Sequence, residues 1–472
     1  MSSNNQRLHW SAWGLLIVAG LVAFWPSVWF DFVNWDDPSY ITHNELIKSW
    51  SPQNLGGIAT QTVTRNYAPL TILSFLIDHT IWGMKPGGYH ATNVLLHILN
   101  GVLVLLLVRQ ISGSRFVAWT TAALFLVHPV QIETVAWISS RKGILSATFM
   151  LAALIARLKK EPGEKADLWY IAFLSAALLS KALAVVVPAI VLAWDLRVRR
   201  QKFADAFPRQ IIPGLLCVLL LLKTIASQNS VMGGVRGHME FSIWKIIGID
   251  ATILWTYIRM LVWPTDLCVL YDPAVDGIWK SVVAASLAWI AILAFVWKKR
   301  ESNPLLLWAG FTFFILLFPV LNFFRITTLM NDRYLYLPCI LVFGVIAAGL
   351  RRLLSVPEEL RSQLPGRITS TSRWLIGGTL VAVAIFATAA HLPVWQNPNT
   401  LWTHAMEENG QIPVVRIQMA LTKYDSGHKR EAVRILQRAL SQTEPDEQDR
   451  ERIQNFLKEW QQELAGRTLP RL

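Results

Sequence analysis

Residues 10–41 of the chain read WSAWGLLIVAGLVAFWPSVWFDFVNWDDPSYI. The first part, Trp10–Phe30, is an apolar run long enough to span a bilayer, which takes roughly 20 apolar residues. Two adjacent acids, Asp36 and Asp37, follow where such a span would reach water. Carboxylates are costly to bury in lipid, but at the membrane surface one of them can accept a proton from a substrate hydroxyl. The stretch therefore predicts a retained first transmembrane helix followed by catalytic acids, with a polar Asp-Pro turn as the plain alternative.

The composition is that of a polytopic membrane protein. Of 472 residues, 53% are hydrophobic and only 16% are charged, which leaves more apolar surface than a soluble protein of this size could bury. The net charge of +13 comes from 44 basic and 31 acidic residues, and in a membrane protein it indicates basic cytoplasmic loops rather than nucleic-acid binding. The three cysteines are far apart and form no C-x-x-C pair, which argues against a disulfide framework or a zinc site.

The apolar segments and the positive-inside rule together predict a topology. The positive-inside rule requires the basic clusters to lie on one side of the membrane; these are at 109–115, 159–165, 197–202, 298–300 and 351–373. That arrangement is met only if Leu168–Trp194 is a hairpin that turns near Lys181 and if Trp244–Trp263 does not cross the membrane. The fold class is then all-α, with about 11 transmembrane helices, the N-terminus inside and the C-terminus outside. The nine clear spans are Trp10–Phe30, Ala91–Val108, Phe116–Val130, Val135–Ala156, Gln210–Ala226, Ser281–Trp297, Leu305–Leu321, Leu335–Leu350 and Trp374–His391.

This topology divides the chain into two domains. Residues 1–392 form a transmembrane catalytic domain, whose outer loop 31–89 carries the acids, and residues 393–472 form a polar tail outside the membrane. Small and large residues between Ala420 and Leu440 are spaced as in one tetratricopeptide repeat. A simple helical hairpin is the alternative. We expect deletion of the tail after Leu392 to change acceptor choice or stability before it changes basal chemistry.

Acids and bases converge on the outer face, which suits a reaction with a protonated nucleophile and an anionic leaving group. Each residue also has a structural interpretation: His90, Asn93 and His97 share one helix face and could bond to neighbouring helices, and Glu133 could pair with a nearby cation. No metal-ligand spacing is present, so we predict no protein-held metal. The candidates are Asp36 and Asp37 as catalytic acids and Arg65, His90, Asn93, His128, Glu133, Arg141, Lys142, Lys181, Asp332 and Arg333 as substrate-binding residues.

With these motifs in place, the chain resembles the GT-C superfamily of membrane glycosyltransferases, and within it the O-mannosyltransferases that carry C-terminal tetratricopeptide repeats. The matching pieces are spread over nearly the whole chain, and their order is more specific than any one of them. They are residues 34–41 (NWDDPSYI), 66–70 (NYAPL), 88–97 (GYHATNVLLH), 128–142 (HPVQIETVAWISSRK), Ser180-Lys181 and 331–338 (NDRYLYLP).

The resemblance implies a polyprenyl- or dolichyl-phosphate sugar donor, a hydroxyl acceptor on a protein or glycan, and inversion at the anomeric carbon. It makes Asp36 the base and gives Asp37 the role of orienting the acceptor or binding the sugar. It also places Arg141, Lys142, Lys181 and Arg333 where relatives contact phosphate or sugar. The chain departs from the family pattern at Ala68, where an arginine is common and Arg65 could substitute, and at Ala182, where an acid is common. Whether the reaction uses a divalent cation as a cofactor is left open.

The resemblance leaves two rival functions to weigh. A transporter or flippase would place ionisable groups near the membrane centre and often shows internal repeats, which this sequence does not. A non-catalytic scaffold would use the tail to recruit a protein partner. The predicted location is a bacterial inner membrane with the active site outside, with the endoplasmic reticulum membrane as the alternative.

Overall fold

The structure is a computed structural model that describes residues 10–64, 66–158, 168–229, 241–323, 328–355, 366–443 and 445–466. Within these ranges the chain is helical, apart from turns and one isolated β-bridge between Val63 and Asn66. The all-α class predicted from the sequence is therefore confirmed for the described residues.

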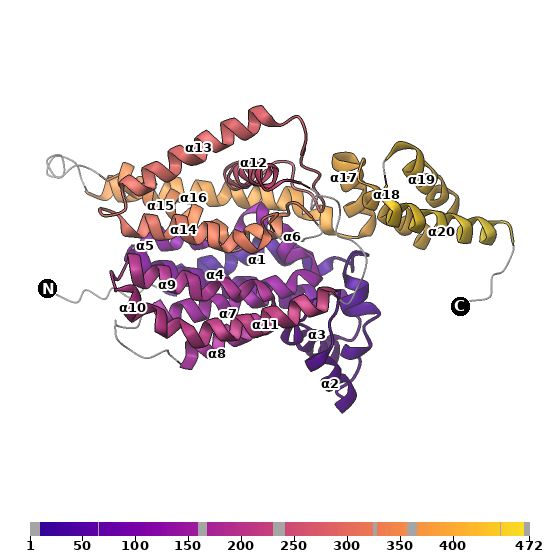
Figure 1. The fold of residues 1–472 in the computed structure, drawn as a ribbon, viewed down its shortest axis with the longest axis horizontal. Helices are drawn as coiled ribbons and strands as arrows, with labels where there is room; N and C mark the ends of the chain where they lie inside the picture. The colour runs from indigo at the N-terminus through magenta and orange to yellow at the C-terminus, as the bar shows by residue number, and fades with distance from the viewer. Residues whose placement is uncertain are drawn as a thin grey trace.

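Most of the long helices run side by side and form one bundle (Figure 1). Their sequences explain their ends: α4 begins with Pro86 in its first turn and ends at Gly113, whose φ of +63° closes the helix in the left-handed region. The bundle helices are α1 (Trp10–Phe24), α4 (Pro86–Ser112), α5 (Arg115–Val127), α7 (Arg141–Leu158), α8 (Leu168–Ser180), α9 (Val187–Arg197), α11 (Ile211–Asn229), α14 (Pro304–Leu317), α15 (Pro338–Leu353) and α16 (Gly366–His391).

The remaining elements of the first 392 residues connect or flank the bundle. The shorter helices are α2 (Pro52–Thr60), α3 (Pro69–Trp82), α6 (Ile132–Ala136) and α10 (Phe203–Ala206), while α12 (Ile243–Val262) and α13 (Trp279–Lys298) lie along one side. Helices α2 and α3 cover one end of the bundle with their own small core around Tyr40, Ile58 and Phe75. The outer loop 31–89 is therefore a folded cap.

Five described helical segments are long and apolar enough to cross a membrane: 86–112, 138–158, 203–224, 279–298 and 371–395. A sixth would be the pair α5 and Pro129–Ala136, which is bent by 54°. Three shorter apolar helical segments, 13–29, 168–180 and 304–320, accompany them. The chain is thus an integral membrane protein, while the count of about 11 spans stays a prediction.

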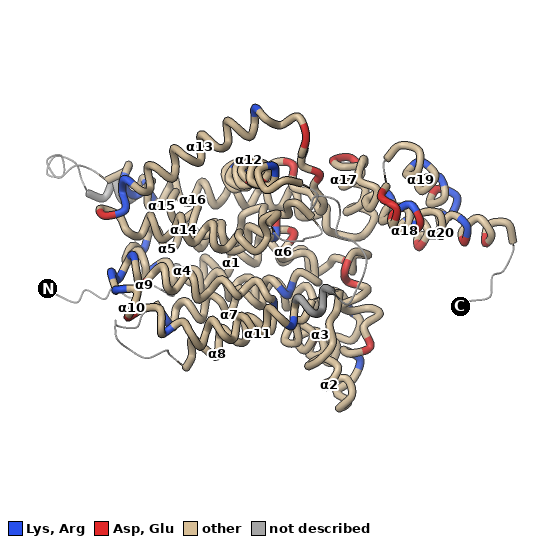
Figure 2. Tube along the Cα trace, in the orientation of Figure 1, with Lys and Arg blue, Asp and Glu red and all other residues tan. Residues whose placement is uncertain are grey.

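Two details of the predicted topology have counterparts in the structure. The segment Leu168–Trp194 is interrupted at Lys181, between α8 and the 3₁₀ turn η6 (Ala182–Val186). Helix α12 is seen end-on in Figure 1, so it lies across the bundle helices, as expected for a segment that does not cross with them. Figure 2 shows the bundle's Lys and Arg residues gathered mainly at the end where α10 lies, which is the distribution that the predicted topology expects.

The tail contains four helices, α17 (Pro398–Asn409), α18 (Pro413–Asp425), α19 (Lys429–Gln442) and α20 (Glu447–Leu464). The expected helix-turn-helix is formed by α18 and α19, with Gly427 at φ +83° in the turn. Buried residues of α17, among them Trp402, belong to the same hydrophobic core as the bundle, whereas α19 and α20 share a separate core around Leu436 and Trp460. The hydrophobic core therefore continues past the predicted boundary at 392, and assignment of the tail as a tetratricopeptide repeat stays a prediction.

Candidate active site

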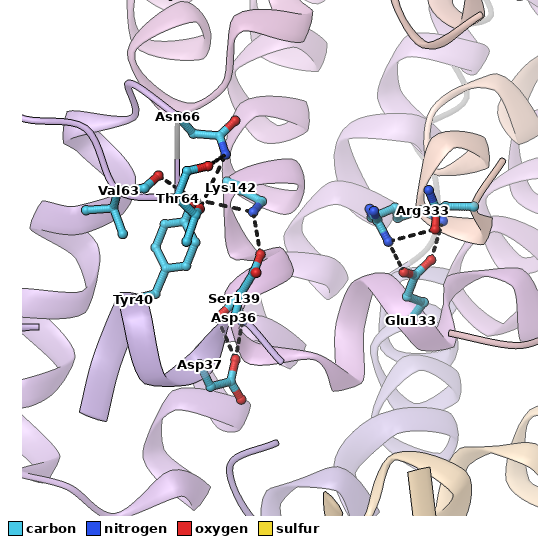
Figure 3. A network of polar contacts seen from close by, with 11 residues as sticks. Asp36, Asp37, Tyr40, Val63, Thr64, Asn66, Glu133, Ser139, Lys142 and Arg333 are labelled. Carbon is cyan, nitrogen blue, oxygen red and sulfur yellow. Dashed lines mark hydrogen bonds and ion pairs between the residues drawn. The ribbon is translucent and has the colours of Figure 1, made fainter. Parts of the chain in front are cut away.

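The two acids of residues 36–37 lie where the chain leaves the first helix and enters the cap. A single π turn, η2 (Pro38–Thr42), follows them directly, closed by the bond from the His43 amide to the Pro38 carbonyl at 2.8 Å. Such turns are rare and are often found at functional sites. This one places Tyr40 beside the acids. Asp36 and Tyr40 face Lys142 in the first turn of α7, and Asp37 faces Ser139 just before that helix (Figure 3).

Asp37 is an anchor between the first loop and the α6–α7 connection. It is almost fully buried, and its carboxylate accepts hydrogen bonds from the Val33 amide at 3.0 Å, the Ser139 amide at 3.1 Å and the Ser139 hydroxyl at 2.5 Å. Burial raises the pKa of Asp37 to about 6, although the three hydrogen bonds act in the opposite direction. These hydrogen bonds tie the first loop to the α6–α7 connection, and a catalytic role for Asp37 stays a prediction.

Asp36 has the opposite surroundings. Its side chain is 27% exposed, and one of its oxygens lies 3.2 Å from the Lys142 ammonium. The Lys142 ammonium also lies 3.4 Å from the Tyr40 hydroxyl, which accepts from Thr64 at 2.7 Å and donates to the Val63 carbonyl at 3.2 Å. Asp36 is therefore an accessible carboxylate held beside a buried cation.

The Trp137 ring brings a second cation close to the first. Lys142 lies 5.7 Å and the Arg333 guanidinium 5.4 Å from the centre of this ring. Arg333 forms an ion pair with Glu133, and its backbone amide donates to the same carboxylate at 2.8 Å. Glu133 is thus the partner of Arg333, a residue 200 positions away, and not of the cations nearer in sequence.

A third cation, Lys181, lies in the turn between α8 and η6. Burial, together with the positive charges of Lys142 and Arg333, lowers its pKa to about 7. Its ammonium lies next to Gly143, because a Cβ added at that glycine would be 3.8 Å from it. Three basic side chains from distant segments therefore share one region, and an anion such as a phosphate group bound there would favour the charged form of Lys181.

Asp332 lies beside Arg333 but faces another partner. It is buried, and its carboxylate accepts from the Tyr271 hydroxyl at 2.5 Å. Burial and the negative charge of Glu133 raise the pKa of Asp332 well above its ordinary value. Its contacts link the segment after α12 to the Arg333 turn.

Other predicted site residues form ion pairs or hydrogen bonds with neighbouring parts of the fold. Arg141 is fully buried in an ion pair with Asp78, donates to the Asn93 side chain at 2.8 Å and to the Tyr89 carbonyl at 2.7 Å, and lies 4.6 Å from the Phe75 ring. The Asn93 amide donates in turn to the carbonyls of residues 135, 137 and 138. Asn93 therefore has contacts of the structural kind that were its alternative interpretation, whereas Arg141 pairs with Asp78 and not with Glu133, and a substrate-binding role for either residue stays a prediction.

The two predicted histidines also have local partners. His90 lies 3.4 Å from the Asp31 carbonyl, and the His128 ring accepts from the Val130 amide at 3.2 Å and so caps the turn before α6. Arg65 lies outside the described residues. Among the described residues there is no group of three or more His, Cys, Asp or Glu side chains that could hold a metal ion.

Sequence reasoning missed several members of the site. Tyr40 and Trp137 stand inside motifs that were recognised, but they were not given a role, and Asp78 lies in loop 31–89 outside those motifs. An isolated acid in the apolar segment Leu70–Trp82 is the signal that could have revealed a buried partner, because an unpaired buried carboxylate is too costly to persist.

Comparison with known proteins gives sequence relatives of one kind. The chain is 25% identical to Protein O-mannosyl-transferase TMTC1 of Homo sapiens, over 90% of this chain and 54% of the human protein. It is also 25% identical to Protein O-mannosyl-transferase TMTC4 of Mus musculus, over 72% of this chain and 56% of that protein.

The chain is similar to the protein O-mannosyl-transferases. The resemblance predicted from the motifs is thus confirmed, and the chain spans about half the length of these curated relatives. No family model matches the chain. Among solved structures, ArnT from Cupriavidus metallidurans bound to undecaprenyl phosphate is 14% identical, covers 93% of this chain and 82% of its own, and has a TM-score of 0.40, which is a weak similarity.

Proposed function

We propose that this protein is a GT-C-type membrane glycosyltransferase. It transfers mannose or a similar hexose from a polyprenyl- or dolichyl-phosphate donor to a hydroxyl group of a protein or glycan on the outer side of the membrane. The observation that carries the proposal is the accessible Asp36 carboxylate beside three converging cations, in a chain similar to named O-mannosyl-transferases.

Asp36 acts as the general base. Its carboxylate takes the proton of the acceptor hydroxyl, and the acceptor oxygen attacks the anomeric carbon from the face opposite the phosphate. The bond between the anomeric carbon and the phosphate oxygen breaks, and its electron pair stays on the phosphate. The products are the glycoside, with inverted anomeric configuration, and the free lipid phosphate.

The cations serve the leaving group. Lys181 and Arg333 attract the donor phosphate, and Lys142 is shared between that phosphate and Asp36. Fixed positive charges that need no rearrangement lower the energy of the developing phosphate charge. Glu133 holds the Arg333 side chain in this position through its ion pair. Arg141, Asn93, His90 and His128 support these elements through the contacts described above.

The bilayer explains the architecture. A donor with a polyprenyl tail stays in the lipid, so the enzyme that uses it must present its acid and cations at the membrane surface. The outer face is the end of the bundle that carries the cap and the tail, opposite the basic end (Figure 2). In this proposal that face is the periplasmic side of a bacterial inner membrane, and no protein-held metal takes part.

The test uses the purified full-length protein in lipid. Wild type and Asp36→Asn are incubated with a panel of radiolabelled polyprenyl-phosphate sugars, and release of free lipid phosphate is followed with and without a hydroxyl-bearing peptide. We expect wild type to release lipid phosphate from at least one donor and Asp36→Asn to be slower by about 10²–10⁴-fold, the usual contribution of a general base.

Asp31→Asn is the matched control, because Asp31 is an exposed acid of the same loop. It should behave as wild type. Folded wild type that releases nothing from any donor would instead favour a transporter or a scaffold.

A further inference from the structure

The side chain of Asn34, two residues before Asp36, is held at both ends by the tail. Its carbonyl oxygen accepts from the Trp402 indole at 2.6 Å, and its amide donates to the Thr422 hydroxyl at 3.0 Å. Trp402 lies in α17 and Thr422 in α18, and both are buried. The Trp35 ring meets the Trp402 ring edge-on, with centroids 5.5 Å apart.

The tail also contacts the other side of the site. The Trp395 ring stacks on Trp137, with centroids 6.1 Å apart, and Trp137 is the ring beside which Lys142 and Arg333 lie. The Gln396 carbonyl accepts from the Asp31 amide at 2.9 Å. The start of the tail thus touches both the acid segment and the ring beside the cations.

We infer that α17 and α18 are part of the catalytic module, with Trp402 and Thr422 as positioning residues that act on Asp36 through Asn34. This inference rests on the proposed function, because it gives Asp36 the chemical step. The segment from Asn34 to Asp36 is short, so a movement of the Asn34 side chain is transmitted directly to the base. Asp37 fixes the other side of the segment through Ser139.

The contacts of Asn34 distinguish a positioning role of Trp402 and Thr422 from a general contribution of these residues to the stability of the fold. Asn34 is only partly buried, whereas its two partners are buried, Trp402 in the core that α17 shares with the bundle and Thr422 in α18. Loss of the Thr422 oxygen leaves the Asn34 amide without that acceptor, while Lys181 and Arg333, which meet the donor phosphate, come from other elements. The chemical step should therefore suffer while donor affinity is kept.

The experiment compares three variants of the full-length protein in lipid. Thr422→Val removes the acceptor, Thr422→Ser keeps it, and Thr443→Val is the matched control, because the Thr443 hydroxyl likewise donates to the carbonyl four residues earlier but lies at the end of α19. The readouts are kcat and KM for the lipid donor and amide hydrogen exchange of the peptide covering residues 33–40.

We expect Thr422→Val to lower kcat on the order of ten-fold, less than the roughly hundred-fold loss that a 1 Å misplacement can cause, with KM for the donor unchanged. Exchange of residues 33–40 should be faster in Thr422→Val and near wild type in the other two. If Thr422→Val does not fold, Trp402→Phe, which keeps a ring but loses the N–H donor, should show the same pattern.

Two results would overturn the inference. One is that Thr422→Val has the same kcat, and the same amide hydrogen exchange of residues 33–40, as the control variant Thr443→Val. The other is an equal fall in Thr422→Ser, which would mean that the hydroxyl contact is not the cause. Wild type that turns over no donor would overturn the proposed function, and exchange of residues 33–40 would still show whether the tail holds the loop.

Discussion

At the residue scale, Asp36 and Asp37 are neighbours in sequence, but the fold gives their carboxylates different surroundings. Asp36 is partly exposed and faces Lys142, whereas Asp37 is enclosed and accepts three hydrogen bonds. The π turn after them points Tyr40 toward Lys142 as well. In the proposed function Asp36 is the acid that meets the substrate, while the hydrogen bonds of Asp37 tie down the loop that carries both.

The raised pKa of Asp37 predicts a pH-dependent stability. Its pKa of about 6 lies above the value of 3.8 for an exposed aspartate, so the folded protein holds this proton more tightly than the unfolded chain. The resulting stabilisation is complete below about pH 4 and is lost as the pH rises to about 6, a change of roughly 3 kcal/mol at about 1.4 kcal/mol per pKa unit.

Thermal unfolding of wild type and Asp37→Asn in lipid between pH 4 and 7 measures this effect. Relative to the variant, wild type should lose stability as the pH rises from 4 to 6 and change little above that. Parallel curves for the two proteins over this range would contradict the assignment.

Arg141 provides a second prediction, because its ion pair with Asp78 is buried. Arg141→Ala should lower stability by roughly 3–5 kcal/mol, since it leaves a buried carboxylate without a partner. The double variant Arg141→Leu, Asp78→Leu should recover most of this loss, because replacing both charges with apolar side chains is often neutral. Melting temperature and donor turnover of both proteins are the measurements.

The double variant also tests where Arg141 acts. If Arg141 is structural, recovery of folding should restore donor turnover. A well-folded double variant that no longer uses donor would show that Arg141 contacts the substrate.

At the scale of elements, the tail is not uniform. Helices α17 and α18 contact the acid segment and share the bundle's core, whereas α19 and α20 pack in a second core, to which α18 also contributes Ile417 and Ala420. These contacts give a different expectation from the sequence, which assigned the whole tail to acceptor choice and stability.

Two truncations separate the halves of the tail. A protein ending at Ser426 keeps the partners of Asn34 and should still release lipid phosphate from its donor, though it loses stability where α18 is uncovered. A protein ending at Leu392 loses those partners and the Trp395 ring, so its donor turnover should fall at least ten-fold, as for a misplaced base. Folded Leu392-terminated protein with wild-type turnover would refute this division.

The elements that sequence reasoning predicted well are those set by local patterns. The hairpin interruption at Lys181 coincides with the end of α8 at Ser180, and the helix-turn-helix of α18 and α19 lies where the repeat spacing placed it. Apolar periodicity and turn residues act over a few positions, so they can be read directly from the chain.

Partners across long separations could not be predicted in this way. Asn34 and Thr422 are 388 positions apart, and Arg333 and Glu133 are 200 apart. Many pairings of acids and bases would satisfy the same composition and topology, and only the packed bundle selects one. For this reason Arg141 and Lys142, adjacent in sequence, were both assigned to the substrate although their side chains face different partners.

At the scale of the whole molecule, charge and apolar surface orient the protein. Basic residues gather at the end of the bundle where α10 lies, and the cap, the tail and the candidate site lie toward the other end (Figures 1 and 2). Helix α13 is exposed along nearly its whole length, as expected for a helix that faces lipid. In the proposed function, this arrangement puts the site at a membrane surface, where a lipid-linked donor and a water-soluble acceptor can meet.

The most direct test of the central claim is transfer of labelled sugar to an acceptor. Wild type, Asp36→Asn and the control Asp31→Asn are reconstituted in lipid with radiolabelled polyprenyl-phosphate mannose and a hydroxyl-bearing peptide, and label on the peptide is counted. We expect wild type and Asp31→Asn to label the peptide and Asp36→Asn to fall by about 10²–10⁴-fold. Equal labelling by wild type and Asp36→Asn would contradict the account, because the base would then lie elsewhere.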